Sequence, residues 1–374
     1  MLPVLLLAVA APQGSSGLHW ETVPAPEWDA LFDRESGWTG GDGIYSIPLD
    51  GTDAPAGFRR TSTLFLFSDT FLGDVNPDGT RAPGTRLVNN TVGLAPPGPP
   101  DPSALHFFWG FDAQGEPQAV FVPEVPSAGP GDFYWLKDGI HLNGRTWIFA
   151  ARFSPQIRRQ GVTRIEIPAG DLPPFPNAVQ VEVPLALPPA NGLGAVVFPS
   201  CLMPNTASAG APFPDGYVYA YGTREDPSKK LLVARVAEAD FEDMSAWRFW
   251  DGAAWVPDLA AAAPVAQRLS NENSVTPLPD GRFLLVFQRD SLSPRVEAAV
   301  ADAPTGPWPE TRTIYWAPEA LGDPDVYPYN AKTHPHLSRP GELLISYNVN
   351  TLDFLDHFAD ADLYRPRFLK LRFR

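Results

Sequence analysis

The chain has 374 residues and a formal net charge of −15, from 43 acidic and 28 basic residues. This charge argues against nucleic acid as a partner, because polyanion binding depends on Lys and Arg side chains that neutralise phosphates. Hydrophobic content of 44% is normal for a globular core, whereas 44 Pro and 31 Gly favour many turns over long helices. The single cysteine, Cys201, excludes an internal disulfide and is typical of a small buried apolar residue.

The first 11 residues, MLPVLLLAVAA, form an apolar run with small residues near its end. This run is similar to the hydrophobic region and cleavage site of a secretory signal, although it lacks a positively charged start. It is too short to cross a bilayer. We therefore expect residues 1–17 to be a signal peptide and leader and residues 18–374 to form one domain. We expect the mature protein to be secreted or periplasmic, monomeric and without a membrane partner.

Five apolar, aromatic-rich segments of the chain each end in a cluster of polar residues. They occupy residues 63–71, 146–153, 217–225, 282–290 and 342–350. Each segment is typical of a strand, with a shorter strand and a Gly-containing turn before it and another strand after it. Such a repeat predicts an all-β fold, the five-bladed β-propeller, in which one end of every blade meets at a single axial pocket.

The turns of these repeats align a few ionisable residues. Counting back eight residues from the Asp-Gly turn of the first repeat reaches Asp42, and the same count in the fourth repeat reaches Glu272. The equivalent offset in the fifth repeat reaches Lys332, and Asp138 is the nearest match in the second. Because the second strand of a hairpin returns antiparallel to the first, Asp69 at its polar end lies beside Asp42.

Asp42, Asp69 and Glu272 are thus the candidate catalytic carboxylates, gathered at one rim of the propeller. Each of them could instead be a turn or capping residue that bonds nearby backbone. Other polar and aromatic side chains are expected at the same rim, because amide and guanidinium groups bond sugar hydroxyls and aromatic rings stack on sugar faces. The expected substrate-binding residues are Trp38, Arg152, Arg224, Asn271, Asn273, Arg289, Tyr329, Lys332, His334 and Asn348. The arginines could instead bridge blades, and most aromatic residues could pack in the core.

Metal ligands are not assigned, because no spacing typical of a zinc site or of an acidic calcium loop is present. A cation such as calcium at the axis, with His334 or His336 and water as ligands, stays an open alternative. No other cofactor is expected. The sequence also lacks a GxSxG motif and a phosphate-binding glycine loop, which argues against hydrolysis by a nucleophilic serine and against nucleotide chemistry.

The segments GWTGGDGIYSIPL, FSDTFLGDVNPDGTR with NNTVGL, NENSVTPL and YNAKTHPHL resemble a bacterial family of secreted five-bladed propellers long labelled as a domain of unknown function. That family is related to endo-D-arabinanases and more remotely to the arabinanase and sucrase clans of glycoside hydrolases. The resemblance covers the first, fourth and fifth repeats well, and the second and third only through their strand pattern. It implies hydrolysis of furanosidic linkages by Asp42 and Asp69, with Glu272 as the third acid.

The expected function is therefore that of an exported glycoside hydrolase acting on an arabinan-type polysaccharide or oligosaccharide. Its chemistry needs one carboxylic acid to protonate the leaving oxygen and one carboxylate to attack or to activate water. The alternative is a carbohydrate-binding or scaffold propeller without turnover, because a fold alone does not imply activity.

Overall fold

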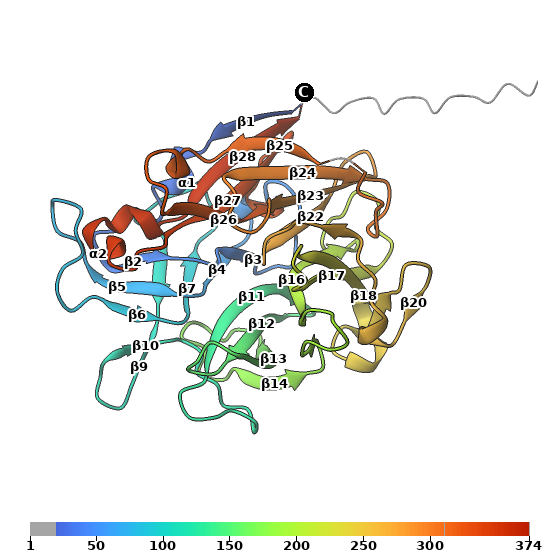
Figure 1. Cartoon of the computed structure of the whole chain (residues 1–374), viewed down its shortest axis with the longest axis horizontal. Helices are drawn as coiled ribbons and strands as arrows, with labels where there is room; N and C mark the ends of the chain where they lie inside the picture. Colours follow the sequence, from blue (N-terminus) through green and yellow to red (C-terminus); the bar gives the residue numbers. More distant parts are fainter. Residues whose placement is uncertain (1–19, 310, 374) are drawn as a thin grey trace, which may run out of the picture.

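The computed structural model describes residues 20–309 and 311–373, and its main sheets surround a central axis like the blades of a propeller (Figure 1). Each sheet is antiparallel, and its strands follow one another outward from the axis. This arrangement confirms the predicted all-β, five-bladed propeller. Residues 1–17 lie outside the described residues, so the signal peptide stays a prediction. No helix among the described residues is long and apolar enough to cross a membrane.

The first four blades follow one another along the chain, and each is built outward from one innermost strand. The first blade comprises β3 (Tyr45–Pro48), β4 (Thr63–Phe67), β7 (Thr91–Ala95) and β8 (His106–Phe108). The second comprises β11 (Phe133–Leu142), β12 (Arg145–Phe153), β13 (Arg159–Ile167) and β14 (Val179–Val183). The third contains β16 (Val196–Asn205), β17 (Tyr217–Arg224) and β18 (Lys230–Ala237), extended by β15 (Ala186–Leu187), β19 (Arg248–Trp250), β20 (Trp255–Val256) and β21 (Ala266–Gln267). The fourth comprises β22 (Asn273–Pro277), β23 (Phe283–Gln288), β24 (Arg295–Ala301) and β25 (Arg312–Trp316).

The fifth blade joins the two ends of the described chain. It comprises β26 (Val326–His334), β27 (Glu342–Thr351), β28 (Arg367–Phe373) and, outermost, β1 (Trp20–Pro24). Because β1 pairs with β28 along its full length, an N-terminal strand completes a C-terminal sheet and closes the ring (Figure 1).

Smaller elements lie outside the blades. Two further sheets are formed by β2 (Ser36–Gly41), β5 (Thr70–Asp74) and β6 (Arg86–Val88), and by β9 (Gly110–Phe111) and β10 (Pro117–Gln118). The helices are short: α1 (Pro26–Asp29) and α2 (Asp356–Ala359), and the 3₁₀ turns η1 (Gly57–Arg59), η2 (Glu238–Asp240), η3 (Met244–Ala246), η4 (Leu259–Ala261), η5 (Pro318–Leu321), η6 (Pro335–Leu337) and η7 (Ala361–Tyr364).

Hydrophobic clusters fill the spaces between neighbouring blades. In β4, alternate side chains point to opposite faces: Phe65 and Phe67 pack toward the fifth blade, and Leu64 and Leu66 pack toward the second. Both faces of such a strand are buried, which explains why the middle strands read as unbroken apolar runs in the sequence. The core is therefore divided among the blade interfaces, and the axis is left to polar side chains.

The innermost strands β3, β11, β16, β22 and β26 converge on the axis (Figure 1). They enclose a narrow channel of about 50 Å³. At the end of the axis where these strands begin, the channel gives way to a much larger cavity of about 1080 Å³. This cavity is at the end to which the polar clusters were assigned from the sequence.

Candidate active site

The large cavity is lined by side chains from several blades that are far apart in the sequence. Asp42 comes from the first blade, Trp135 and Lys137 from the second, Glu272 from the fourth and Tyr329 from the fifth. A ring of blades thus assembles ionisable and aromatic groups around one space.

Asp42 and Asp69 are held side by side through their backbones. The Asp42 amide donates a hydrogen bond to the Asp69 carbonyl oxygen (3.1 Å), and the Ser68 amide donates to the Asp42 carbonyl oxygen (2.8 Å). The following residue, Gly43, has a φ of +90°, and a Cβ atom there would lie 2.9 Å from the Ser68 amide nitrogen. Glycine is therefore required at this close approach. The structure confirms the predicted adjacency of the two aspartates.

The Asp42 carboxyl is set up to hold a proton. Its Oδ2 accepts a hydrogen bond from the Tyr329 hydroxyl (2.7 Å), whereas Oδ1 is buried without a hydrogen-bond partner among the described residues. Burial raises the pKa of Asp42 to about 8, and the negative charges of Asp69 and Glu272 act in the same direction. Asp42 is therefore mostly protonated at neutral pH.

Asp69 has a different environment. Its Oδ1 accepts hydrogen bonds from the Trp135 indole Nε1 (2.8 Å) and from the Asn89 side-chain amide (3.1 Å). Burial raises the pKa of Asp69, and these two donors oppose the rise because they stabilise the carboxylate. Both donors engage the same oxygen, and Oδ2 makes no hydrogen bond within the described part of the chain. The carboxyl group is thus fixed in orientation with one oxygen free.

Glu272 is buried and forms an ion pair with Lys332. The Lys332 Nζ lies 2.7 Å from Glu272 Oε2, 3.2 Å from the Asn330 carbonyl oxygen and 4.8 Å from the centre of the Tyr45 ring. The turn offset in the sequence predicts equivalent positions for Glu272 and Lys332 in consecutive blades. Equivalent positions lie next to each other around the axis, which explains why these two residues meet.

Five of the expected substrate-binding residues lie on or below the cavity. Asn271 and Tyr329 line it. Asn273, Lys332 and His334 line the narrow channel instead. Asn273 is fully buried, and neither its amide nitrogen nor its amide oxygen has a partner among the described residues. The His334 ring lies between the hydroxyls of Ser46 and Ser346, both at 2.7 Å, and burial lowers its pKa well below the usual range.

The predicted substrate contact has to be corrected for Asn273, Lys332 and His334, because these residues line the narrow channel and not the large cavity. It also has to be corrected for Trp38, which is 1% exposed and stacks on Phe107 with ring centres 4.5 Å apart. Asn348, on β27, is likewise buried away from the cavity lining.

The three arginines expected at the rim are structural ion pairs. Arg152 pairs with Asp132 (2.5 Å), Arg224 with Asp226 (3.0 Å) and Arg289 with Glu297 (2.6 Å). None of the three arginines lines the cavity: Arg152 lies on β12 between Ala151 and Phe153, which do line it, whereas Arg224 ends β17 and Arg289 follows β23. The expected contact between these arginines and a ligand is therefore corrected as well.

Two residues at the site were not singled out from the sequence. Lys137 lines the cavity from the innermost strand of the second blade. Tyr364, in η7, is buried, and its side chain favours the carboxylate form of Asp42 and so lowers the pKa of that group. The only sequence signal for Lys137 is a lysine inside an otherwise apolar strand, FYWLKDGIHL. Tyr364 has no such signal in the sequence, because a short 3₁₀ turn shows no repeating pattern of apolar residues.

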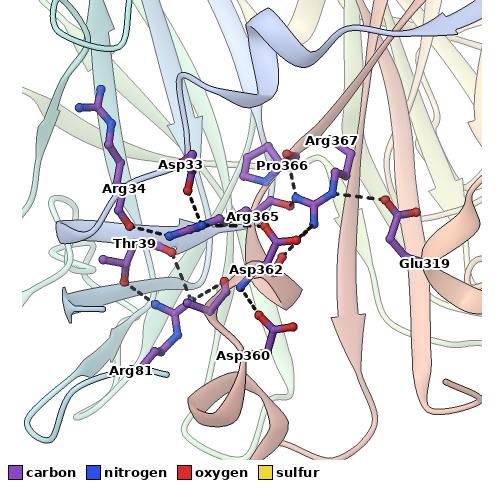
Figure 2. Close-up of polar contacts among 11 residues, drawn as sticks. Asp33, Arg34, Thr39, Arg81, Glu319, Asp360, Asp362, Arg365, Pro366 and Arg367 are labelled. Atoms are coloured by element: carbon purple, nitrogen blue, oxygen red, sulfur yellow. Dashed lines mark hydrogen bonds and ion pairs between the residues drawn. The ribbon is translucent and has the colours of Figure 1, made fainter. Parts of the chain in front are cut away.

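The loop segment that carries Tyr364 is fastened by arginines (Figure 2). Arg81 donates to the Thr39 carbonyl and the Ala361 carbonyl, each at 3.2 Å. Figure 2 also shows Arg365 and Arg367 holding the same segment, and Arg367 contacts Glu319 at 3.3 Å. The Arg81 contacts join the sheet of β2, β5 and β6 to the segment between β27 and β28 of the fifth blade.

Within the described residues, no group of three or more His, Cys, Asp or Glu side chains is placed to hold a metal ion. The axial cation therefore stays an untested alternative.

The fold and the axial cavity define a five-bladed propeller with a cluster of carboxyl groups at one end of the axis. Residues 26–372 match the family described as Domain of unknown function (DUF5005), and the chain belongs to that family. Comparison with curated protein sequences gives no match.

Two solved structures show similar folds. A protein from Bacteroides ovatus, described as a "putative hydrolase", is 20% identical, with a TM-score of 0.72 over 96% of this chain and 93% of that chain. The alpha-L-arabinofuranosidase of Podospora anserina, solved in complex with cellotriose, is 11% identical, with a TM-score of 0.50 over 95% of this chain and 97% of that chain. The propeller fold is thus shared with a glycoside hydrolase.

Proposed function

We propose that the protein is a secreted glycoside hydrolase that cleaves furanosidic, arabinan-type linkages of a polysaccharide or oligosaccharide. The observation that carries the proposal is that Asp69 lies next to Asp42, a carboxyl group with a pKa of about 8 at the wall of a cavity of about 1080 Å³. Glycoside hydrolysis needs a carboxylic acid that is protonated at working pH beside a carboxylate, and the two environments separate these roles.

In the proposed mechanism, Asp42 gives its proton to the glycosidic oxygen as the bond from the anomeric carbon to that oxygen breaks. The free oxygen of Asp69 attacks the anomeric carbon, and a glycosyl ester forms. Water then attacks the anomeric carbon of this ester while Asp42 takes a proton from it, which releases the sugar and restores both acids. Glu272 acts through its negative charge, which helps to keep Asp42 protonated.

The substrate class rests on two supports. The sequence segments around Asp42, Asp69 and Glu272 resemble a propeller family related to arabinanases, and a solved propeller of similar fold is an arabinofuranosidase. The cavity is also at the upper end of the volumes that accept a ligand of several rings. Export to the periplasm or beyond is part of the proposal, because long glycans are met outside the cell and the chain starts with a signal-like run.

The test is reducing-sugar release from a panel of arabinans, arabinogalactan, fructans and xylans by the wild type and by Asp42→Asn. A matched control is Asp50→Asn, an exposed turn residue at the other end of the same hairpin. Release by the wild type and the control, but not by Asp42→Asn, would support the proposal. Binding without release from any of these glycans would instead favour a non-catalytic carbohydrate-binding propeller.

A further inference from the structure

Lys137 occupies an unusual position on the wall of the cavity. In the pairing of β11 with β12, Leu136 faces Ala150 and Gly139 faces Ile148, so that Lys137 and Asp138 together oppose a single residue. This is a β-bulge, which re-aims side chains and is common beside active sites. Its result is that Lys137 lines the large cavity, whereas Asp138 lines the narrow channel.

The Lys137 side chain is largely buried but has no polar partner in the described part of the chain. The residue is only 9% exposed, yet within the described residues its ammonium group makes no hydrogen bond and no ion pair. Burial lowers the pKa of Lys137 to about 8, and the attraction of Glu272 only partly opposes this effect. Lys137 Nζ is not one of the fully buried polar atoms, and the residue lines the cavity, so its ammonium group is open to an anion that enters the cavity.

The acids on the cavity wall do not supply this anion. Glu225 is paired with Arg159, Glu182 lies 3.1 Å from Arg152, and Glu272 lies 2.7 Å from Lys332. Asp42 is mostly neutral at pH 7. None of these carboxyl groups pairs with Lys137, whose positive charge therefore has no ion-pair partner among the described residues, in a chain whose net charge is −15.

We propose that Lys137 binds a singly charged anionic substituent of the sugar substrate, a carboxylate or a sulfate ester, so that the substrate is an acidic glycan. One ammonium group balances one negative charge, which favours these groups over a doubly charged phosphate. The inference rests on the proposed function, because it assigns a substrate class to the same cavity. It narrows that class to a glycan with an acidic unit next to the cleaved linkage.

The experiment measures binding, not turnover. The probes are a galacturonate trisaccharide and its fully methyl-esterified form, which has the same backbone without the charge, titrated calorimetrically at pH 6.5. Wild type should bind the acid about tenfold or more tightly than the ester, as expected for a hydrogen bond to a charged group. Galactose 6-sulfate against galactose forms the second pair, and it distinguishes a sulfate ester from a carboxylate as the source of the charge.

The decisive variant is Lys137→Met, which keeps the length of the side chain and removes the charge. It should lose the preference in either pair, whereas Lys137→Arg should keep it. Arg158→Gln is the matched control, because Arg158 is an exposed cation that lines the same cavity and would produce an equal loss if only the general field mattered. Thermal unfolding of each variant checks the fold.

Equal binding of the charged and neutral member in both pairs would overturn the inference, as would a preference that survives in Lys137→Met. Failure of this inference is separable from failure of the proposed function. Hydrolysis of neutral arabinan without any preference for acidic ligands would support the hydrolase and contradict the anion site. A Lys137-dependent preference without turnover of any glycan would support the anion site and contradict the hydrolase.

Discussion

The Tyr329 hydroxyl donates a 2.7 Å hydrogen bond to Oδ2 of Asp42, and this bond joins the fifth blade to the first at the wall of the cavity. The bond stabilises the ionised form of Asp42 and so opposes the burial that raises its pKa to about 8. Removal of this bond should therefore change the pKa of Asp42, the proposed catalytic acid.

Tyr329→Phe should raise the pKa of Asp42 further, because the variant removes a donor to the carboxylate. If Asp42 is the general acid, the alkaline limb of kcat/KM should lie near pH 8 in the wild type and move to higher pH in the variant. The pH–rate profile measures the shift. Tyr327→Phe is the control. Tyr327 lines the same cavity, and within the described residues its hydroxyl makes no hydrogen bond to Asp42. A shift toward lower pH in Tyr329→Phe would contradict this assignment.

Glu272→Gln should move the same alkaline limb in the opposite direction, to lower pH. The negative charge of Glu272 raises the pKa of Asp42, so its removal makes Asp42 easier to ionise. The variant also leaves Lys332 buried without its counter-ion, which should cost on the order of 2 kcal/mol of unfolding free energy. An unchanged profile and an unchanged stability would show that the ion pair is not coupled to Asp42.

The two effects of Glu272→Gln can be separated with a second variant. Glu272→Gln combined with Lys332→Met removes both charges, so it should recover much of the lost stability while the shift of the pH profile remains. Denaturant unfolding and the pH–rate profile of the single and double variants give both measurements. If the pH–rate profile of the double variant returned to that of the wild type together with the stability, the charge of Lys332, not that of Glu272, would control the pKa of Asp42.

Asp42→Asn should change how stability depends on pH. The folded state raises the pKa of Asp42 from its usual 3.8 to about 8, so between these values the folded protein binds a proton that the unfolded chain does not. Wild-type stability is therefore lost as pH rises through this window. The variant lacks the titration, and its fall in unfolding free energy between pH 5 and pH 8 should be smaller. Parallel curves for the two proteins would show that Asp42 ionises normally.

The turn offset predicted which ionisable residues approach the axis because it follows the regular geometry of hairpins. It located Asp42 and Glu272 at the cavity and Lys332 beside Glu272. It could not locate Lys137, because a bulge shifts the alternation of side chains by one residue and leaves no trace in the apolar pattern. Tyr364 could not be predicted either, because it lies in a short 3₁₀ turn between strands, where the hairpin geometry gives no offset to count from.

The rim arginines are the reverse case, because the sequence predicts a ligand contact that the structure does not have. A polar cluster at the end of a middle strand predicts side chains that face the axis, but alternate residues of such a strand point to opposite faces. Ala151 and Phe153 line the cavity, and Arg152 between them does not. Arg152 and Arg289 instead pair with acidic residues of their own blades. The sequence alone does not distinguish an arginine that binds a ligand from one that forms an ion pair within its sheet, because both occur in the polar cluster at the end of a strand.

Asp69→Asn should preserve the fold and reduce activity by at least ~100-fold if Asp69 is a nucleophile or a general base. The asparagine oxygen can still accept the hydrogen bonds from Trp135 and Asn89, so the local structure has no reason to change. Activity and melting temperature are measured together, with Asp50→Asn as the control. A strongly lowered melting temperature would instead identify Asp69 as a structural turn residue.

The stereochemistry of the product tests the pairing of the two aspartates. Asp42 and Asp69 are joined through their backbones across one hairpin, and directly opposed side chains in such a pair have Cβ atoms roughly 4.5–5.5 Å apart. Carboxyl groups about 5 Å apart suit a retaining mechanism through a covalent intermediate, whereas inversion needs roughly 6.5–9.5 Å to admit a water molecule. We therefore expect the first-formed sugar to retain its anomeric configuration, as followed by proton NMR during the first minutes of hydrolysis. An inverted product would rule out Asp42 with Asp69 as the catalytic pair and would point to Asp42 with Glu272 across the cavity.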